Sequence, residues 1–197
     1  MKIFFDTEFT GLHKNTTLIS IGLIDEDGRT FYAEFNDYDE SQCDEWIYEH
    51  VIKNLKWSKE GPVEEFVNLL GNGSLEVYGD TKYIKDALTD WLWRYDTVEL
   101  VSDVCHYDMV LFIDIFGDAF KLPNKVTPAC HDINQDIANH FNISEHEAFD
   151  MSREGIIETY NKKVNWPEYE IKDIEGDKHN SLYDAKVIKA LYTHILN

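Results

Sequence analysis

The chain has 197 residues, of which 43% are hydrophobic, enough to build the core of one globular domain, and we expect residues 1–197 to form that single domain. It carries 18 Lys and Arg against 38 Asp and Glu, a net charge of −20, which argues against a large electrostatic surface for nucleic-acid phosphates. No stretch approaches the ~18 apolar residues of a membrane span, and no signal peptide precedes the first predicted strand, so we expect no membrane partner.

The cysteines give a second exclusion. Cys43, Cys105 and Cys130 are far apart and odd in number, and none belongs to the spaced Cys or His pairs of a zinc site. This usage indicates free, buried thiols in a reducing compartment. We therefore expect a cytoplasmic protein.

The first predicted strand ends in two carboxylates. The apolar run 3–5 leads into Asp6 and Glu8, whose i, i+2 spacing places both side chains on the same face of a strand. Two like charges side by side are costly unless a partner neutralises them, and a hard divalent cation does so well. The alternative places Asp6 at the end of the strand and Glu8 in a solvated turn, and for an isolated Asp-x-Glu it would be preferred.

The elements that follow alternate between strands and helices. Residues 16–25 and 29–35 read as strands of a hairpin, in which Gly22 suits close packing or a bulge. Residues 165–177 read as an acidic loop that covers the site. The other predicted elements are helices at 45–55 and 63–70, a strand at 75–78, a helix at 81–95, a strand at 97–102, a helix at 107–116, a strand at 127–131 and helices at 132–141, 144–160 and 181–196. This order predicts an α/β fold with a mixed sheet, a three-strand antiparallel part plus parallel strands, and helices on both faces.

Two further carboxylates and a histidine fall near ends of core elements. Asp108 lies at the start of helix 107–116, and Asp184 lies in the first turn of the last helix, five residues after His179. Singly, each has an ordinary explanation: the helix dipole for Asp108, a capping box with Ser181 for Asp184, and a loop position for His179. Together with the first pair they suit a two-cation phosphoryl-transfer site, in which a histidine removes the proton of the attacking water.

Three ordered motifs resemble those of the DEDDh 3′–5′ exonucleases. Residues 6–12 (DTEFTGL) resemble the family's DTETTGL first motif. Residues 101–108 (VSDVCHYD) resemble its second motif, V-A-H-N-x-x-F-D, with Asp103 and Val104 in place of the usual His-Asn pair. Residues 179–185 (HNSLYDA) resemble its third motif, H-x-A-x-x-D-A.

The resemblance implies a ribonuclease-H-like fold and removal of nucleotides from a 3′-hydroxyl end. It implies that Asp6, Glu8 and Asp184 ligate one Mg²⁺ or Mn²⁺ ion, that Asp6 also reaches a second, and that Asp108 holds the second mainly through water. His179 would be the general base. The family's first-motif loop contacts the terminal nucleotide, which implies a substrate-binding role for these residues: Thr7, Phe9, Thr10 and Leu12. An aromatic side chain at position 9 is compatible with base stacking or with a core position.

Within that family, the opening third is most similar to the RNase AS exoribonucleases, which prefer adenylated RNA. The similarity lies in residues 6–9 (DTEF), 18–22 (LISIG), 26–29 (EDGR) and the W-x-x-x-H-V pattern of residues 46–51. RNase AS acts as a homodimer, and the resemblance implies a homodimer as one possible assembly of this protein.

The leading hypothesis is a metal-dependent 3′–5′ exoribonuclease that hydrolyses single-stranded or adenylated RNA from the 3′ end and releases nucleoside 5′-monophosphates. The first alternative is a 3′–5′ DNA exonuclease of the proofreading or repair type, because the same motifs and metals serve both polymers. A second alternative, of a different class, is a non-catalytic nucleic-acid-binding module on the same fold. Such a module would lack one of the four carboxylates or His179, and this sequence contains all five residues.

Overall fold

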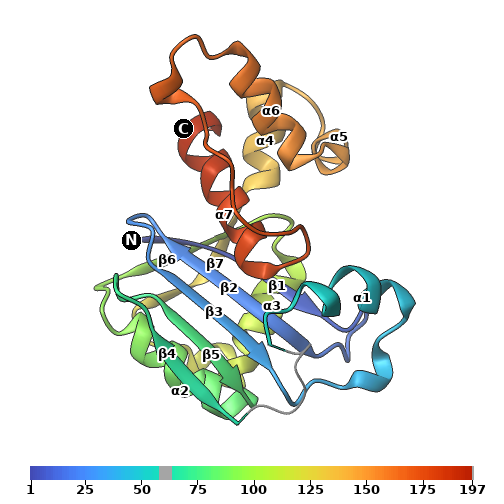
Figure 1. Ribbon diagram of the computed structural model, residues 1–197, viewed down its shortest axis with the longest axis vertical. Coiled ribbons are helices and arrows are strands. Elements are labelled where there is room, and N and C mark those ends of the chain that lie inside the picture. The colour runs from blue at the N-terminus through green and yellow to red at the C-terminus, as the bar shows by residue number, and fades with distance from the viewer. Residues whose placement is uncertain (58–63, 197) are drawn as a thin grey trace.

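The computed structural model describes residues 1–57 and 64–196 (Figure 1). Its described strands form a seven-stranded sheet in the order β4-β5-β3-β2-β1-β6-β7. The strands are β1 (Lys2–Phe9), β2 (Leu18–Asp25), β3 (Thr30–Phe35), β4 (Phe66–Leu69), β5 (Leu75–Gly79), β6 (Val98–Ser102) and β7 (Val126–Asp132). β1, β2 and β3 pair antiparallel, as do β4 and β5, whereas β3 pairs parallel with β5, β1 with β6 and β6 with β7. The predicted mixed sheet is therefore confirmed.

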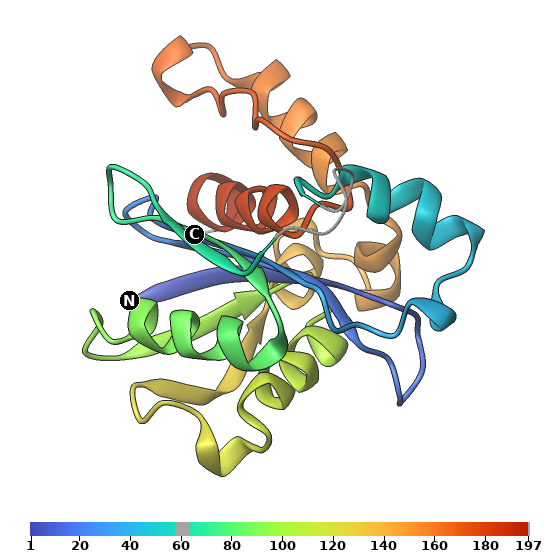
Figure 2. The same ribbon diagram turned by 60° about the horizontal axis from the view of Figure 1, so that its bottom comes forward.

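Helices cover both faces of this sheet. They are α1 (Glu45–His50), α2 (Thr81–Leu92), α3 (His106–Phe116), α4 (Ile133–Phe141), α5 (Glu145–Asp150), α6 (Arg153–Lys163) and α7 (Ser181–Leu191), which continues into a π-helical turn at Tyr192–Leu196. Figure 2 shows α2 and α3 on one face and α7 on the other. Among the described helices, none combines the length and apolar character that a membrane crossing requires.

The alternation of side chains along β1 divides the core into two layers. Ile3 and Phe5 pack against α2 and α3 in one buried cluster, whereas Phe4 packs with α4, α6 and α7 in the other. The third cluster joins Ile19 of β2 to α1. Because Asp6 and Glu8 share the parity of Phe4, the sequence directs both carboxylates to the face that α7 covers.

Gly22 permits the closest contact between the sheet and α7. A Cβ atom at Gly22 would lie 2.3 Å from the main-chain nitrogen of Leu182 and 2.4 Å from the carbonyl carbon of Ser181. Beside it, the hydroxyl groups of Ser20 and Ser181 are hydrogen-bonded at 2.9 Å. Of the two roles considered for this glycine, close packing is the one found, and it brings the start of α7 directly against β2.

Three predicted elements are corrected. The helix predicted at 63–70 is wrong, since Phe66–Leu69 forms the edge strand β4 and pairs antiparallel with β5; residue 63 lies outside the described residues. A short apolar run does not distinguish a helix from a strand, and here the free backbone groups of β5 decide the outcome. Helix 45–55 ends at His50 and is followed by a 3₁₀ turn at Ile52–Asn54, and helix 144–160 divides into α5 and α6 where Ser152 caps the second helix.

All three cysteines are free, as predicted, although each is half-buried rather than fully buried.

Candidate active site

β1 carries Asp6 and Glu8 inside the strand rather than beyond its end. They lie opposite Gly22 and Ser20 of β2, and the register of the pair shifts only between Glu8 and Phe9. The alternative of a strand-end Asp6 and a solvated Glu8 is therefore wrong. Both side chains are half-buried and line one pocket beneath α7.

Asp108 reaches the same pocket from the first turn of α3 and is only 6% exposed. Its Oδ1 accepts hydrogen bonds from the main-chain N–H of Thr7 at 3.1 Å and from the hydroxyl of Thr7 at 2.5 Å. Its Oδ2 accepts one from the hydroxyl of Ser102 at 3.1 Å. These donors from β1 and β6 fix the carboxylate beside the strand that carries Asp6.

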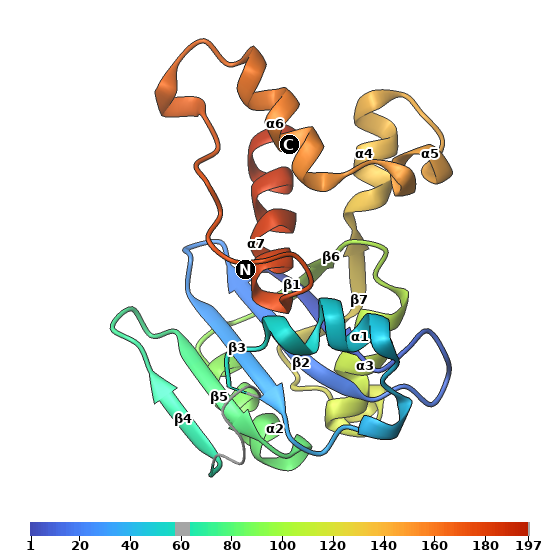
Figure 3. The ribbon, with the colours of Figure 1, turned by 45° about the vertical axis from the view of Figure 1, so that its right-hand side comes forward.

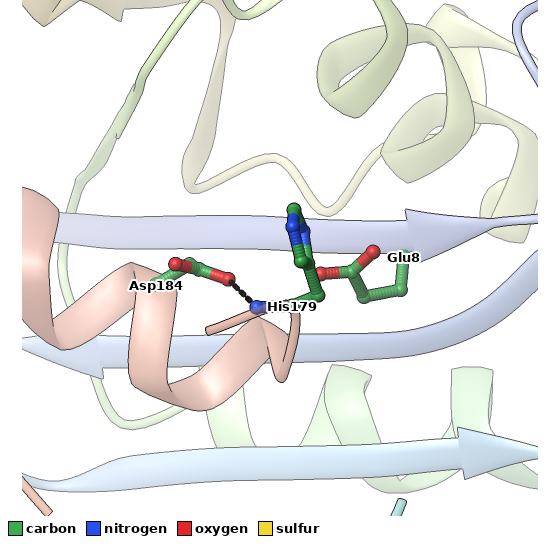
Figure 4. Close-up of side chains that lie close together, drawn as sticks. All are labelled: Glu8, His179 and Asp184. Carbon is green, nitrogen blue, oxygen red and sulfur yellow. Dashed lines mark hydrogen bonds between the residues drawn. The ribbon is translucent and has the colours of Figure 1, made fainter. Parts of the chain in front are cut away.

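His179 and Asp184 are joined by the turn that begins α7. The main-chain N–H of His179 donates to Oδ2 of Asp184 at 2.9 Å (Figure 4). Asn180 is the N-cap, because its Oδ1 accepts from the main-chain N–H groups of Leu182 and Tyr183. The alternative explanation of Asp184 by a capping box with Ser181 is therefore wrong, because the side chain of Asp184 accepts its hydrogen bond from His179, the residue before the N-cap.

The turn also places Glu8 next to this pair. Glu8, His179 and Asp184 each offer a ligand atom, and these atoms lie within 4.8 Å of one another. Figure 4 shows the imidazole of His179 between the carboxylates of Glu8 and Asp184. One residue from β1 and two from the N-terminus of α7 thus converge, although they are distant in the sequence.

A pocket of about 480 Å³ unites all five predicted catalytic residues, which are Asp6, Glu8, Asp108, His179 and Asp184. Its wall on the α6 side is formed by Met151, Ser152, Arg153 and Glu154. Over the described chain, no residue of 165–177 lines the pocket, so the cover expected from that loop is wrong. Residues 151–154, just before and at the start of α6, line the pocket instead.

Burial raises the pKa values of the four carboxyl groups. Burial is the largest cause for Asp6 and Glu8, whose pKa values lie well above the ordinary range, and the neighbouring carboxylates add to it. Burial raises the pKa of Asp184 to about 7, against the opposing hydrogen bond from His179. It raises the pKa of Asp108 to about 6, against the opposing bonds from Thr7 and Ser102.

These oxygen atoms form a donor set suited to hard divalent cations. In the described residues, none of the four carboxylates forms an ion pair with Lys or Arg. Burial and repulsion between like charges disfavour the ionised carboxylates, and a cation that binds between them removes this penalty. Sites rich in oxygen ligands select Mg²⁺, Mn²⁺ or Ca²⁺. The residues present therefore fit a divalent metal centre.

α1 adds an aromatic wall that the sequence did not mark as functional. The rings of Trp46 and His50 are stacked, with centroids 4.6 Å apart, and the ring of His179 meets that of Trp46 edge-on at 5.1 Å. Figure 3 shows α1 beside the start of α7. Burial, helped by Lys178 and His50, lowers the pKa of His179, so its imidazole is neutral at neutral pH. The W-x-x-x-H spacing places Trp46 and His50 one helical turn apart, and it was the sequence signal that could have identified this wall.

The four predicted substrate-binding residues have different environments. Thr7 and Thr10 are buried, and their hydroxyl groups donate to Asp108 and to the side chain of Gln42. Phe9 stacks on Tyr107 at 5.3 Å, and Leu12 is 79% exposed. A second cavity of about 320 Å³ adjoins the first and is lined by these residues: Glu8, Phe9, Thr10, Gly11, Leu12, Asp44, Trp46 and Ile47.

The departures in the second motif have structural counterparts. Asp103, in place of the usual histidine, is held by Arg153 through bonds of 2.6 and 2.8 Å. Val104, in place of the usual asparagine, keeps a positive φ of 54°, which is rare for a β-branched residue. The main-chain N–H of Val104 donates to Asp132 at 3.0 Å. Arg153 was not identified from the sequence, because its partner lies fifty residues away.

Comparison with solved structures supports the fold. A 3′-exonuclease, in a structure described as 3′-end specific recognition of histone mRNA stem-loop, aligns with a TM-score of 0.60 at 12% identity over 99% of this chain. The chain spans 63% of that protein chain. The nuclease domain of 3′hExo, a DEDDh family member bound to rAMP, aligns with a TM-score of 0.60 at 14% identity, over 97% of this chain and 88% of that one.

The sheet and its acidic pocket thus define a DEDDh-type 3′–5′ exonuclease, a hydrolytic enzyme class whose members depend on divalent metal ions. The family model described as 3′-5′ exoribonuclease Rv2179c-like domain matches residues 1–196, and the chain belongs to this family. The 3′-5′ exoribonuclease Rv2179c of Mycobacterium tuberculosis (strain H37Rv) is 31% identical over 145 residues, 68% of this chain and 73% of that protein. The exoribonuclease MT2234.1 of strain CDC 1551 matches equally.

Proposed function

We propose that this protein hydrolyses single-stranded RNA from its 3′ end and releases nucleoside 5′-monophosphates. The observation that supports this most is the convergence of four carboxylates and His179 in one pocket of a chain that belongs to an exoribonuclease family. The name of the mycobacterial relative supports RNA as the polymer. An adenylated 3′ end is the substrate that we propose to test first.

Two divalent ions, Mg²⁺ or Mn²⁺, are the proposed cofactors. Asp6, Glu8 and Asp184 would hold one ion, and Asp6 together with Asp108 would hold the other, the latter mainly through water. When bound, such ions supply positive charge to the attacking and leaving oxygen atoms of the phosphodiester. The hydrogen bonds from Thr7 and Ser102 keep Asp108 in the position that this role needs.

His179 is the proposed general base. Its lowered pKa leaves a ring nitrogen free to accept the proton of the attacking water at neutral pH. The ring lies against Trp46, and its main chain is tied to Asp184, so the base has a defined position. A role for His179 as an additional metal ligand is compatible with its distance from Glu8 and Asp184, and the mutant described below distinguishes the two.

The second cavity is the proposed site for the terminal nucleoside. It adjoins the carboxylates through Glu8, and Phe9, Leu12 and Trp46 provide the apolar surface that a base requires. For Thr7 and Thr10 the buried hydroxyl groups indicate an indirect contribution, through Asp108 and through the loop around Gln42. DNA remains the alternative polymer, since no side chain of the described pocket is assigned to a 2′-hydroxyl.

Three further expectations remain proposals. Residues 1–197 would act as one domain, two copies would associate as a homodimer, and the free thiols suit a reducing compartment such as the cytoplasm.

The test uses a 5′-labelled single-stranded RNA ending in adenosines, an RNA ending in another base and the DNA counterpart of each. Each is incubated with the protein in Mg²⁺, in Mn²⁺ and in EDTA. We expect a ladder that shortens from the 3′ end of the RNA and is absent in EDTA. Faster shortening of DNA than of RNA would favour the DNA exonuclease, and no shortening of any polymer would favour a binding module.

A further inference from the structure

Only two cations of the described chain line the acidic pocket, one at the start of α6 and one directly before His179. Arg153 and Lys178 line the larger pocket, together with Glu154, but neither lines the second cavity. The two cavities share Glu8, Phe9 and Leu12 instead. The two cations therefore belong to the larger pocket and not to the cavity proposed for the terminal nucleoside.

Arg153 has no donor left for a substrate. Its Nε–H and one Nη2–H donate to Asp103 at 2.6 and 2.8 Å, and the other Nη2–H donates to Oδ1 of Asn134 at 3.0 Å. Both Nη1–H groups donate to main-chain carbonyls, those of Ala148 at 2.6 Å and Met151 at 2.8 Å. A guanidinium has five N–H donors, and all five have partners here. Arg153 fastens α6 to the loop before α3 and leaves no charge-assisted bond for a phosphate.

The ammonium group of Lys178, in contrast, is available to bind a substrate. Its side chain is exposed, and among the described residues its ammonium group has no ion pair and no hydrogen bond. Its main chain is nevertheless fixed, because its carbonyl accepts a bond of 2.8 Å from the side-chain amide of Asn54. It directly precedes His179 and lines the same pocket as the four carboxylates.

We propose that Lys178 binds the first non-scissile phosphate of the RNA, on the 5′ side of the bond that is cut. The inference rests on the proposed function and adds the path of the strand. With the terminal nucleoside in the second cavity, the scissile phosphate lies over the carboxylates, and the strand continues past the wall that carries Lys178. A compact, mobile ammonium group suits a phosphate that needs a point charge rather than a fixed bidentate partner.

The test compares Lys178→Gln with Lys178→Arg and with Lys172→Gln, a matched loss of charge at an exposed lysine outside the pocket. Each is assayed on a short single-stranded RNA and on a dinucleoside monophosphate, whose only phosphate is the scissile one. On the RNA, Lys178→Gln is expected to raise KM about tenfold with kcat within about twofold, and to reduce the salt dependence of binding by a slope of about 0.7, the value for one phosphate contact with a single strand. On the dinucleotide, which has no phosphate for Lys178 to bind, KM stays unchanged.

Lys178→Arg is expected to keep KM within about threefold, since the charge is retained. An unchanged KM for Lys178→Gln on RNA, or an equal rise on the dinucleotide, would overturn the inference, as would the same effect from Lys172→Gln. Equal melting temperatures and Mn²⁺ affinities of wild type and variant serve as the folding control. If the wild type degrades no RNA, the proposed function itself fails, and this inference fails with it.

Discussion

The main chain of His179 donates a hydrogen bond of 2.9 Å to the carboxylate of Asp184, so one turn holds the proposed base beside a proposed metal ligand. His179 adopts a positive φ of 62° in this turn, a conformation that the surrounding contacts must maintain. Those contacts are the cap at Asn180 and the seating of α7 on β2. The geometry of the site therefore depends on how closely α7 approaches the sheet.

Gly22→Ala is expected to disrupt the site from the sheet side. A methyl group there would lie 2.3 to 2.4 Å from the main chain of α7, so the helix must move away from β1. We expect a loss of at least about 1–3 kcal/mol in the free energy of unfolding and a larger loss of activity than of stability. Gly71→Ala is the control, because nothing lies within 4 Å of its added methyl group. Urea denaturation and RNA hydrolysis rates measure both effects, and wild-type values for Gly22→Ala would contradict the packing.

Metal binding and pH are expected to be linked through the raised pKa values. Without metal, the pKa of Asp184 is about 7 and that of Asp108 about 6 in the folded protein, against about 3.9 in an unfolded chain. Between about pH 4 and pH 7 the folded state therefore binds more protons than the unfolded state. Protonation of these two groups stabilises the folded protein fully below about pH 4, and this stabilisation is lost as the pH rises to about 7. Metal ions bind the deprotonated carboxylates, so the stabilisation that they add grows over the same interval.

Thermal denaturation in EDTA and in Mn²⁺, at about pH 5.5 and about pH 8, measures this linkage. The melting-temperature increase on adding Mn²⁺ should be larger at the higher pH. Asp184→Asn is the control variant and should reduce the pH dependence of the EDTA series. An equal increase at both pH values would be evidence against a metal site built from these carboxylates.

His179→Gln separates the roles of base and metal ligand. As a base, His179 contributes about 10²–10⁴-fold to the rate, and its loss should leave Mn²⁺ affinity nearly unchanged. Isothermal titration with Mn²⁺ and a single-turnover rate measure the two quantities. A large loss of Mn²⁺ affinity together with the activity would instead identify His179 as a ligand. Trp46→Leu, which removes the ring beside His179, should lower kcat to a smaller extent and leave the fold intact.

Thr7→Val tests the support of Asp108. The hydroxyl of Thr7 is the largest influence that lowers the pKa of Asp108 against its burial, so its removal should raise that pKa above about 6. Protons then compete better with metal, and the activity of Thr7→Val should fall more at about pH 6 than at about pH 8, where Asp108 is ionised in both proteins. Thr159→Val is the matched control, because the hydroxyl of Thr159 donates to the carbonyl of Gly155 within α6 and Thr159 does not line the described pocket. A pH-independent loss would mean that Thr7 acts in another way.

Much of this arrangement could be predicted from local patterns. The same-face placement of Asp6 and Glu8 follows from the alternation of a strand, and the final helix follows from its apolar stripe. The relation of Trp46 to His179 could not be derived in this way, since it depends on how α1 packs across β2. The commitment of all five donors of Arg153 likewise arises from contacts between distant segments. β4 was missed because a four-residue edge strand owes its conformation to the partner strand rather than to its own sequence.

The most direct measurement compares wild type with Asp6→Asn on a 5′-labelled RNA in Mn²⁺, with the released products identified. Asp6 is the carboxylate whose pKa burial and the charges of all three others raise, and it is the proposed ligand of both ions, so the substitution keeps the shape of the site and removes its shared charge. The account predicts stepwise shortening from the 3′ end by the wild type, with nucleoside 5′-monophosphates as the product, and a rate at least about 10²-fold lower for Asp6→Asn. Equal rates for the two proteins, or cleavage within the RNA chain, would contradict it.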